Sequence, residues 1–219
     1  MREDVYIDLV VLPSDIVDQE WSNSDRSALM QQQHSFKPKS YNSVDQIPLP
    51  EDELVFISGI GGIGKSTMVD MFTFKWAKGG LANLPNTNFL FKFTCRDLNN
   101  ISGRFTNLKE LFELKFPEVI KFISFEDLME ISDRVLVIVD GTDELKDLYL
   151  FENPSVSTET NLADLVFDLI NPKGKWLPNH KVIASGRLKA IEFIKNKLPR
   201  NSKRKTVEVC GFDDENIRK

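Results

Sequence analysis

Cysteine and histidine are scarce in this sequence, which has two of each among its 219 residues. Two cysteines make neither a disulfide framework nor a zinc site, so a reduced, cytoplasmic compartment is the expectation. The N-terminus lacks the basic start and apolar stretch of a signal peptide, and no apolar run approaches the ~20 residues of a membrane-spanning helix. The formal net charge of −5 argues against general nucleic-acid binding. We therefore expect neither a membrane nor a nucleic acid as partner.

One glycine-rich segment carries the strongest positive signal. Gly59 to Ser66 read Gly-Ile-Gly-Gly-Ile-Gly-Lys-Ser, which fits G-x-x-x-x-G-K-[ST], the phosphate-binding loop (P-loop) of nucleoside triphosphatases. Leu54–Ile57 predicts a short buried strand before the loop, and Thr67–Lys78 predicts a helix after it. Strand, glycine loop and helix in this order are the context that the motif requires.

The residues of the loop have distinct expected roles. Glycines allow the backbone to approach a ligand closely, so that successive N–H groups and the helix N-terminus surround a polyphosphate. Lys65 is expected at the β- and γ-phosphates, and the Ser66 hydroxyl at Mg²⁺. Thr67 either starts the helix or contacts the α-phosphate. The predicted nucleotide-binding residues are Gly59, Ile60, Gly61, Gly62, Ile63, Gly64, Lys65, Ser66 and Thr67.

A second segment supplies acidic side chains. Val135–Val139 is a run of apolar, mostly β-branched residues, typical of a strand buried on both faces, and Asp140 follows at its carboxyl end. Open α/β sheets bind their ligands at that end, so Asp140 is predicted to hold Mg²⁺ directly or through water. Asp143 and Glu144 are candidates to orient or deprotonate the attacking water, with a slight preference for Glu144. The alternative for this pair is a solvated acidic turn.

A third segment ends in an arginine. Val182–Ala184 predicts another buried strand, and Arg187 lies just past its end. An arginine there is a candidate contact for the γ-phosphate, which would distinguish a triphosphate from a diphosphate. The alternative is a surface arginine at the end of a strand.

Together these segments resemble a NACHT domain, the nucleotide-binding module of NOD-like receptors and related STAND P-loop NTPases. The resemblance is strongest at Gly59–Thr67 and at Val135–Leu145, where a small residue follows Asp140 and an acidic pair comes two residues later. Weaker matches are Phe91–Leu98, with its Cys-Arg pair, and Val207–Glu215, with its Gly-Phe-acidic turn. The chain departs from the family at Ser185-Gly186-Arg187-Leu188, where Thr-Ser-Arg-Pro is usual; Arg187 stays in register.

The expected fold is an α/β P-loop NTPase of three layers, α/β/α. Strands alternate with helices, which predicts a mostly parallel sheet covered on both faces. Besides the segments above, strands are predicted at Phe89–Thr94 and Thr206–Cys210, and the resemblance implies the order 5-1-4-3-2 for the five strands. Residues 1–52 are predicted to be an N-terminal arm, with a strand at Val5–Val11, a polar linker and one short helix near residues 24–32.

Residues 53–219 are predicted to be a NACHT-type domain that is truncated at its C-terminus. The helical and winged-helix parts that follow in the family, with a histidine that contacts the β-phosphate, have no counterpart in this chain. His34 and His180 do not replace that histidine in sequence order, and each is predicted to be a surface or strand-edge residue.

The resemblance implies an ATP/ADP-binding switch with slow, Mg²⁺-dependent ATP hydrolysis that controls self-oligomerisation in innate immune or cell-death signalling. Effector and adaptor domains would then lie outside this fragment. One alternative is a nucleotide-binding scaffold fragment that does not hydrolyse. Another is a P-loop GTPase or phosphotransferase, but Asn196-Lys197 is followed by Leu198-Pro199 and lacks the acid of the guanine-reading Asn-Lys-x-Asp segment.

Overall fold

The computed structural model describes the central part of the chain. The described residues are 10–13, 54–79, 81, 84, 86–101, 105–146, 148, 162–199 and 202–211. The linker after residue 13, the short helix predicted near residues 24–32, the part of the N-terminal strand before Val10 and the acidic turn after Gly211 lie outside them.

A single six-stranded sheet organises these residues, in the order β1-β6-β2-β5-β4-β3. The strands are β1 (Val10–Pro13), β2 (Leu54–Ser58), β3 (Phe89–Thr94), β4 (Val135–Asp140), β5 (Lys181–Gly186) and β6 (Arg204–Gly211). The strands from β2 to β6 are parallel neighbours, which confirms the order 5-1-4-3-2 expected for the five-stranded parallel sheet. The sixth strand, β1, joins from the N-terminal arm and runs antiparallel to β6.

Helices connect the parallel strands. The longer ones are α3 (Lys65–Ala77), α5 (Leu108–Lys115), α8 (Leu162–Ile170) and α9 (Leu188–Lys197). The short ones are α4 (Cys95–Leu98), α6 (Pro117–Ile120), α7 (Phe125–Glu130) and the 3₁₀ turns η3 (Ser132–Arg134) and η4 (Thr142–Glu144). At α7 the Ser124 and Asp127 side chains each bond to the other's backbone N–H, which forms a capping box. Within the described part of the chain, no helix has both the length and the apolar character to cross a membrane.

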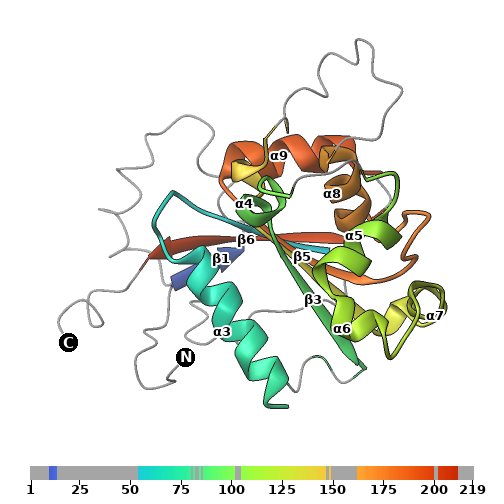
Figure 1. Cartoon of the computed structure of the whole chain (residues 1–219). Coiled ribbons are helices and arrows are strands. Elements are labelled where there is room, and N and C mark those ends of the chain that lie inside the picture. Colours follow the sequence, from blue (N-terminus) through green and yellow to red (C-terminus); the bar gives the residue numbers. More distant parts are fainter. Residues whose placement is uncertain are drawn as a thin grey trace, which may run out of the picture.

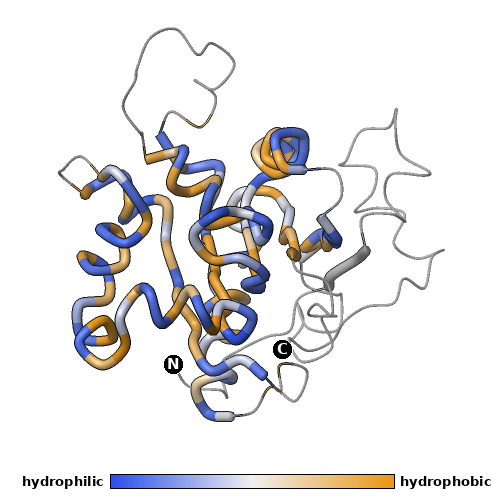
Figure 2. The backbone as a smooth tube through the Cα atoms, turned by 90° about the vertical axis from the view of Figure 1, so that its right-hand side faces the viewer, coloured by the Kyte–Doolittle hydropathy of each residue, from blue (hydrophilic) through white to orange (hydrophobic). Residues whose placement is uncertain are grey.

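The sheet separates two hydrophobic clusters. Phe56, Phe91 and Val137 point to the side that α4, α5 and α7–α9 cover. The residues that alternate with these along the strands, such as Val55 and Ile138, point to the opposite side of the sheet, which α3 covers. Figure 1 shows α3 on one side and α5, α8 and α9 grouped on the other, and Figure 2 shows hydrophobic and hydrophilic residues alternating around the helical coils. The predicted three-layer α/β/α fold is therefore confirmed.

Helix α3 begins earlier than the sequence pattern predicts. Its first residue is Lys65 and not Thr67, because Gly64 adopts a left-handed conformation (φ 101°) as the N-cap and the helix follows at once. Lys65 and Ser66 therefore belong to its first turn. Met68 and Phe72, four residues apart on one face of the helix, are buried in the cluster between α3 and the sheet.

The prediction for His180 is wrong. Its side chain is fully buried, with Nε2 2.8 Å from the carbonyl oxygen of Leu169 and Nδ1 close to that of Leu177. The Leu169 carbonyl belongs to the last turn of α8 and the Leu177 carbonyl to the loop before β5, so the ring joins the two ends of this connection. Burial lowers the pKa of His180, and the two carbonyls, which favour N–H donors, offset only part of that effect.

This buried ring makes the stability of the domain depend on pH. The folded-state pKa of His180 lies below its ordinary value of 6.5, so the unfolded chain takes up the proton first. The free energy of unfolding is then highest above pH 6.5 and falls as the pH drops toward the folded-state pKa. We expect a slope approaching about 1.4 kcal/mol per pH unit in that window.

Urea unfolding of the wild type and of His180→Gln, from neutral to mildly acidic pH, measures this slope. Glutamine keeps a polar side chain but does not titrate, so the variant should show a shallower dependence. Parallel curves would contradict the assignment of this pH dependence to His180.

Candidate functional site

The glycine loop between β2 and α3 has no room for side chains at its tightest point. A Cβ at Gly59 would lie 2.9 Å from the Val209 carbonyl oxygen and 3.1 Å from the Ile63 side chain. The loop is thus packed against β6, with Gly59 buried and Gly61 and Gly62 exposed. Glycine is required at position 59 because β6 and Ile63 leave no space for a Cβ. At the exposed Gly61 and Gly62 the backbone itself forms the surface of the loop.

Lys65 folds back over this loop. Its ammonium donates hydrogen bonds to the carbonyl oxygens of Gly59 (3.0 Å) and Ile60 (2.9 Å). Burial lowers the pKa of Lys65, nearby Asp143 opposes this, and Arg187 adds to the lowering. The first turn of α3 contains no acidic residue, so nothing in that turn offsets the positive end of the helix. Loop, helix end and lysine together present positive charge on one side of the site.

Asp140 closes the site from β4. It is only 3% exposed, and its Oδ1 accepts a hydrogen bond from the Ser66 hydroxyl at 3.2 Å. The Ser185 hydroxyl donates to the same oxygen and accepts from the Gly141 N–H at 3.2 Å. The fold therefore brings together Ser66 and Asp140, the two residues predicted to hold the metal.

Two arginines hold the acidic pair of η4. Asp143 accepts from the Arg187 backbone N–H (3.0 Å) and pairs with the Arg187 side chain at 3.0 Å. Arg96, at the start of α4, donates a hydrogen bond to each carboxylate oxygen of Glu144, at 3.0 and 2.8 Å. In this arrangement neither carboxylate is free of a cationic partner.

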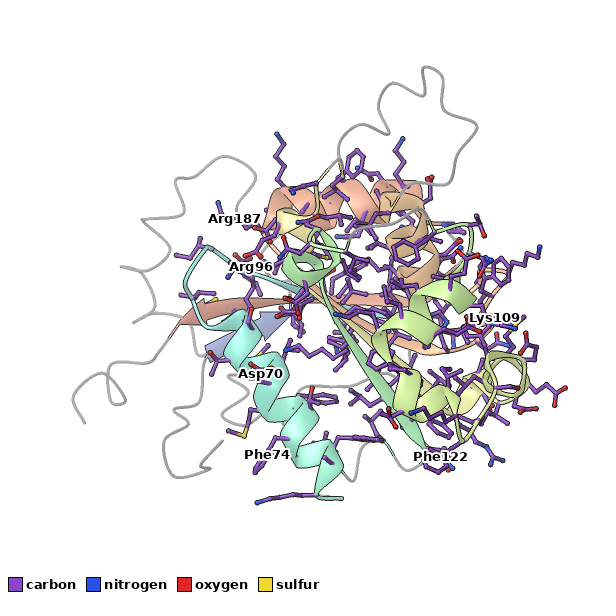
Figure 3. The ribbon with its side chains drawn as sticks, viewed as in Figure 1. Asp70, Phe74, Arg96, Lys109, Phe122 and Arg187 are labelled. Atoms are coloured by element: carbon purple, nitrogen blue, oxygen red, sulfur yellow. The ribbon has the colours of Figure 1, made fainter. Side chains whose placement is uncertain are left out.

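Arg187 also reaches the glycine loop. A Cβ placed on Gly61 would lie 3.1 Å from Nη2 of Arg187, so the guanidinium lies directly against the loop. Figure 3 shows Arg187 and Arg96 at the end of the sheet where α3 begins, coming from different elements. Arg187 thus lies beside both the glycine loop and the acidic turn.

The oxygen ligands available here suit Mg²⁺ better than a metal ion that is coordinated only by protein side chains. Among the described residues, no group of three or more His, Cys, Asp or Glu side chains is placed to hold a metal. Mg²⁺ typically takes one or two protein oxygens and completes its shell with phosphates and water. The Ser66 hydroxyl and the Asp140 carboxylate, side by side next to a glycine cradle, fit that requirement.

Sequence patterns did not indicate several neighbours of these residues. Lys92 on β3 approaches Asp140, and the carboxyl side chain of Asp70 on α3 pairs with Lys92. Arg96 appeared only as part of a family-like Cys-Arg pair. Ser185 stands at a departure from the family pattern, yet its hydroxyl bonds to Asp140. Residue spacing cannot reveal such contacts, because each joins different strands or helices.

A glycine loop at the end of the first parallel strand, with a carboxylate from a neighbouring strand beside its serine, defines a P-loop nucleotide-binding domain. The chain belongs to the NACHT domain family, whose model matches residues 53–219.

Curated relatives include multidomain proteins of much greater length. NACHT, LRR and PYD domains-containing protein 12 of Mus musculus is 29% identical over 91% of this chain and 18% of its own length. Nucleotide-binding oligomerization domain-containing protein 2 of Homo sapiens is 28% identical over 75% of this chain and 15% of its own. The chain thus spans less than a fifth of these relatives. Among solved structures, the Aeropyrum pernix ORC2 protein in its ADP form aligns over 72% of this chain and 42% of that chain, with 15% identity and a TM-score of 0.40.

The contact between η4 and β5 leaves no space for a side chain at Gly186. A Cβ there would lie 2.1 Å from the hydroxyl oxygen of Thr142, which is buried and has no hydrogen-bond partner among the described residues. We expect Gly186→Ala to lower the free energy of unfolding by about 1–3 kcal/mol, because the turn that carries Asp143 must move.

Thr142→Ala removes the clashing oxygen, so the double variant should regain most of the lost stability. Urea unfolding of the wild type, both single variants and the double variant gives the coupling energy. Strictly additive effects would show that the two residues do not press on each other.

Proposed function

We propose that this chain is the ATP/ADP-binding switch domain of a NOD-like-receptor-type signalling protein, with slow, Mg²⁺-dependent ATP hydrolysis that controls self-oligomerisation. The observation that carries the proposal is the hydrogen bond between Ser66 and Asp140 at the mouth of a glycine loop capped by Lys65. A phosphate-binding loop alone would support only anion binding. The adjacent hydroxyl and carboxylate add a place for the divalent cation that accompanies a nucleoside triphosphate.

The loop and Lys65 would bind the phosphates. The Lys65 ammonium now donates to two loop carbonyls, and a bound phosphate would take over those N–H donors with a full negative charge. The carbonyl oxygens carry only partial charge, whereas phosphate oxygens carry full negative charge, so Coulomb attraction to the ammonium favours the phosphate. The backbone N–H groups from Gly59 to Thr67 would complete the cradle.

Ser66 and Asp140 would hold Mg²⁺. Once bound with the nucleotide, Mg²⁺ supplies positive charge that offsets the charge of the β- and γ-phosphates. The Ser185 hydroxyl and the Gly141 N–H keep the Asp140 carboxylate oriented toward Ser66.

Hydrolysis requires a group that orients or accepts a proton from water, and Glu144 is our first choice, with Asp143 the alternative. Glu144 is the more exposed of the two, at 40% of its side chain against 17% for Asp143. Both carboxylate oxygens of Glu144 accept hydrogen bonds from Arg96. Arg96 must therefore release Glu144 before that carboxylate can act on water. Arg187, paired with Asp143 and next to the loop, would respond to the γ-phosphate.

The cellular setting belongs to the same proposal. The name of one relative includes nucleotide binding and oligomerisation, and that of another includes NACHT, LRR and PYD domains. By analogy, self-assembly and effector or adaptor domains outside this chain would use the nucleotide state in innate immune signalling. A cytoplasmic location is supported by Cys95 and Cys210, the two cysteines of the chain, which form no disulfide with each other.

A nucleotide-binding scaffold without hydrolysis is the second candidate. The pairing of Asp143 with Arg187 and of Glu144 with Arg96 favours it, since both potential bases are neutralised. Turnover by the purified chain separates the two candidates: nucleotide binding with no release of phosphate would favour the scaffold. Competition between ATP and GTP tests the GTPase reading, which requires preference for guanine.

Loss of Lys65 tests phosphate binding. We expect Lys65→Ala to weaken the binding of Mg-ATP by on the order of a hundredfold, because at least one charge-assisted bond to phosphate disappears. Isothermal calorimetry measures the affinity. Lys75→Ala is the matched control, since it removes the same charge from the last turn of the same helix. Equal affinities for Lys65→Ala and the control would contradict the proposed site.

Loss of the Glu144 carboxylate tests hydrolysis. We expect Glu144→Gln to slow ATP turnover by about a hundredfold or more while the affinity for Mg-ATP changes little, as general-base catalysis typically contributes that much. Phosphate release and calorimetry on the same preparation give both quantities, and Asp143→Asn provides the comparison. If binding and turnover fall together, Glu144 holds the turn in place and is not the base.

A further inference from the structure

One basic side chain of β3 lies partly buried on the face of the sheet that α3 covers. β3 alternates between the two faces: Phe91 and Phe93 belong to the cluster under α5, and Leu90 packs in the cluster under α3. Lys92 shares the face of Leu90, and its side chain is only 23% exposed. A half-buried ammonium requires anionic or hydrogen-bonding partners, because burial without them is costly.

Two carboxylates provide those partners. The Lys92 ammonium pairs directly with Asp70 on α3, whose side chain is 47% exposed, and lies 4.0 Å from Oδ2 of Asp140, whose side chain is 5% exposed. Figure 3 marks Asp70 on α3, further along the helix than the loop. Lys92 is therefore shared between an outer carboxylate and an inner one.

The two oxygens of Asp140 have different surroundings. Oδ1 accepts from the Ser66 and Ser185 hydroxyls, whereas Oδ2 faces the Lys92 ammonium. Hydroxyl donors alone leave the full negative charge of a nearly buried carboxylate uncompensated. Lys92 supplies the compensating charge when no divalent cation is bound.

We propose that Lys92 is a positioning residue that acts through Asp140: it is the built-in counter-ion of that carboxylate and raises the Mg²⁺ concentration at which the site binds nucleotide. This inference rests on the proposed function, since it concerns the same cation site. A divalent cation held by Asp140 and Ser66 would repel the ammonium, so the two compete for one carboxylate. Asp70 is the second anchor, which draws Lys92 away from Asp140 and so weakens that competition.

Three variants separate these roles. Lys92→Met removes the charge but keeps an unbranched chain on the apolar face. Lys92→Arg keeps the charge. Asp70→Asn removes the outer anchor and leaves Asp140 as the remaining acidic partner of Lys92 among the described residues.

The first measurement is nucleotide affinity during a titration with Mg²⁺, using a fluorescent ATP analogue. Lys92→Met should lower the Mg²⁺ concentration for half-saturation by on the order of tenfold, because the competing charge is gone. Lys92→Arg should stay near the wild type. Asp70→Asn should move in the opposite direction to Lys92→Met and require more Mg²⁺.

The second measurement is thermal unfolding without nucleotide, with and without Mg²⁺. In Lys92→Met the carboxylate of Asp140 loses the ammonium that lies 4.0 Å from its Oδ2, so Mg²⁺ alone should raise the midpoint temperature by a few degrees more than in the wild type. The two measurements are independent, because the second requires no nucleotide and no turnover.

The outcomes distinguish this inference from the proposed function. If the wild type binds nucleotide with Mg²⁺ but Lys92→Met shows the same half-saturation, the inference fails and the proposed function stands. If the wild type binds no nucleotide at any Mg²⁺ concentration, the proposed function fails. The inference about Lys92 is then tested by thermal unfolding, and it is overturned if Mg²⁺ raises the midpoint temperature equally in the wild type and in Lys92→Met. Movement of Asp70→Asn and Lys92→Met in the same direction also overturns it.

Discussion

The hydrogen bond between Ser66 and Asp140 is the contact on which the rest of the site depends. It joins the first turn of α3 to the end of β4, across 74 residues of sequence. β5 lies between β2, which leads into the loop, and β4, which carries the aspartate. The serine and the aspartate therefore meet only because the parallel strands end on the same side of the sheet and α3 begins there, directly after the loop.

Around this contact, each acidic residue at the end of β4 has its own basic partner. Asp140 faces Lys92 from β3, Asp143 pairs with Arg187 from the end of β5, and Glu144 pairs with Arg96 from α4. Three carboxylates within five residues would repel one another in a site of this kind. Basic side chains from three separate elements remove that cost and leave the site balanced in charge before any ligand arrives. Under the proposed function, a nucleotide with its cation would redistribute these pairs, which would give the switch a physical basis.

The sequence predicted the parts of the fold and of the site that depend on local pattern. The apolar runs of β2 and β4 and the glycine spacing of the loop are local signals, and they led to the correct strands. The correct order of the parallel strands came from the resemblance to the NACHT family, because the alternation of strands and helices does not fix it. Element ends were less accurate: α3 starts at Lys65, because the left-handed Gly64 lets the helix begin directly after the loop. His180 was misread because a polar residue before a strand usually lies at the surface, whereas here its ring is buried with one backbone carbonyl oxygen beside each ring nitrogen.

The sequence by itself determined the class of ligand. A glycine loop with Lys65 and Ser66 has one chemical use, and an apolar strand ending in Asp140 has a known place in a parallel sheet. Only the tertiary structure decided which charges face each other. Lys92, Asp70 and Arg96 carry no motif, and their partners lie on other strands and helices at separations that no periodicity encodes. Their roles follow from distances in space, because electrostatic interaction depends on where charges lie and not on their order along the chain.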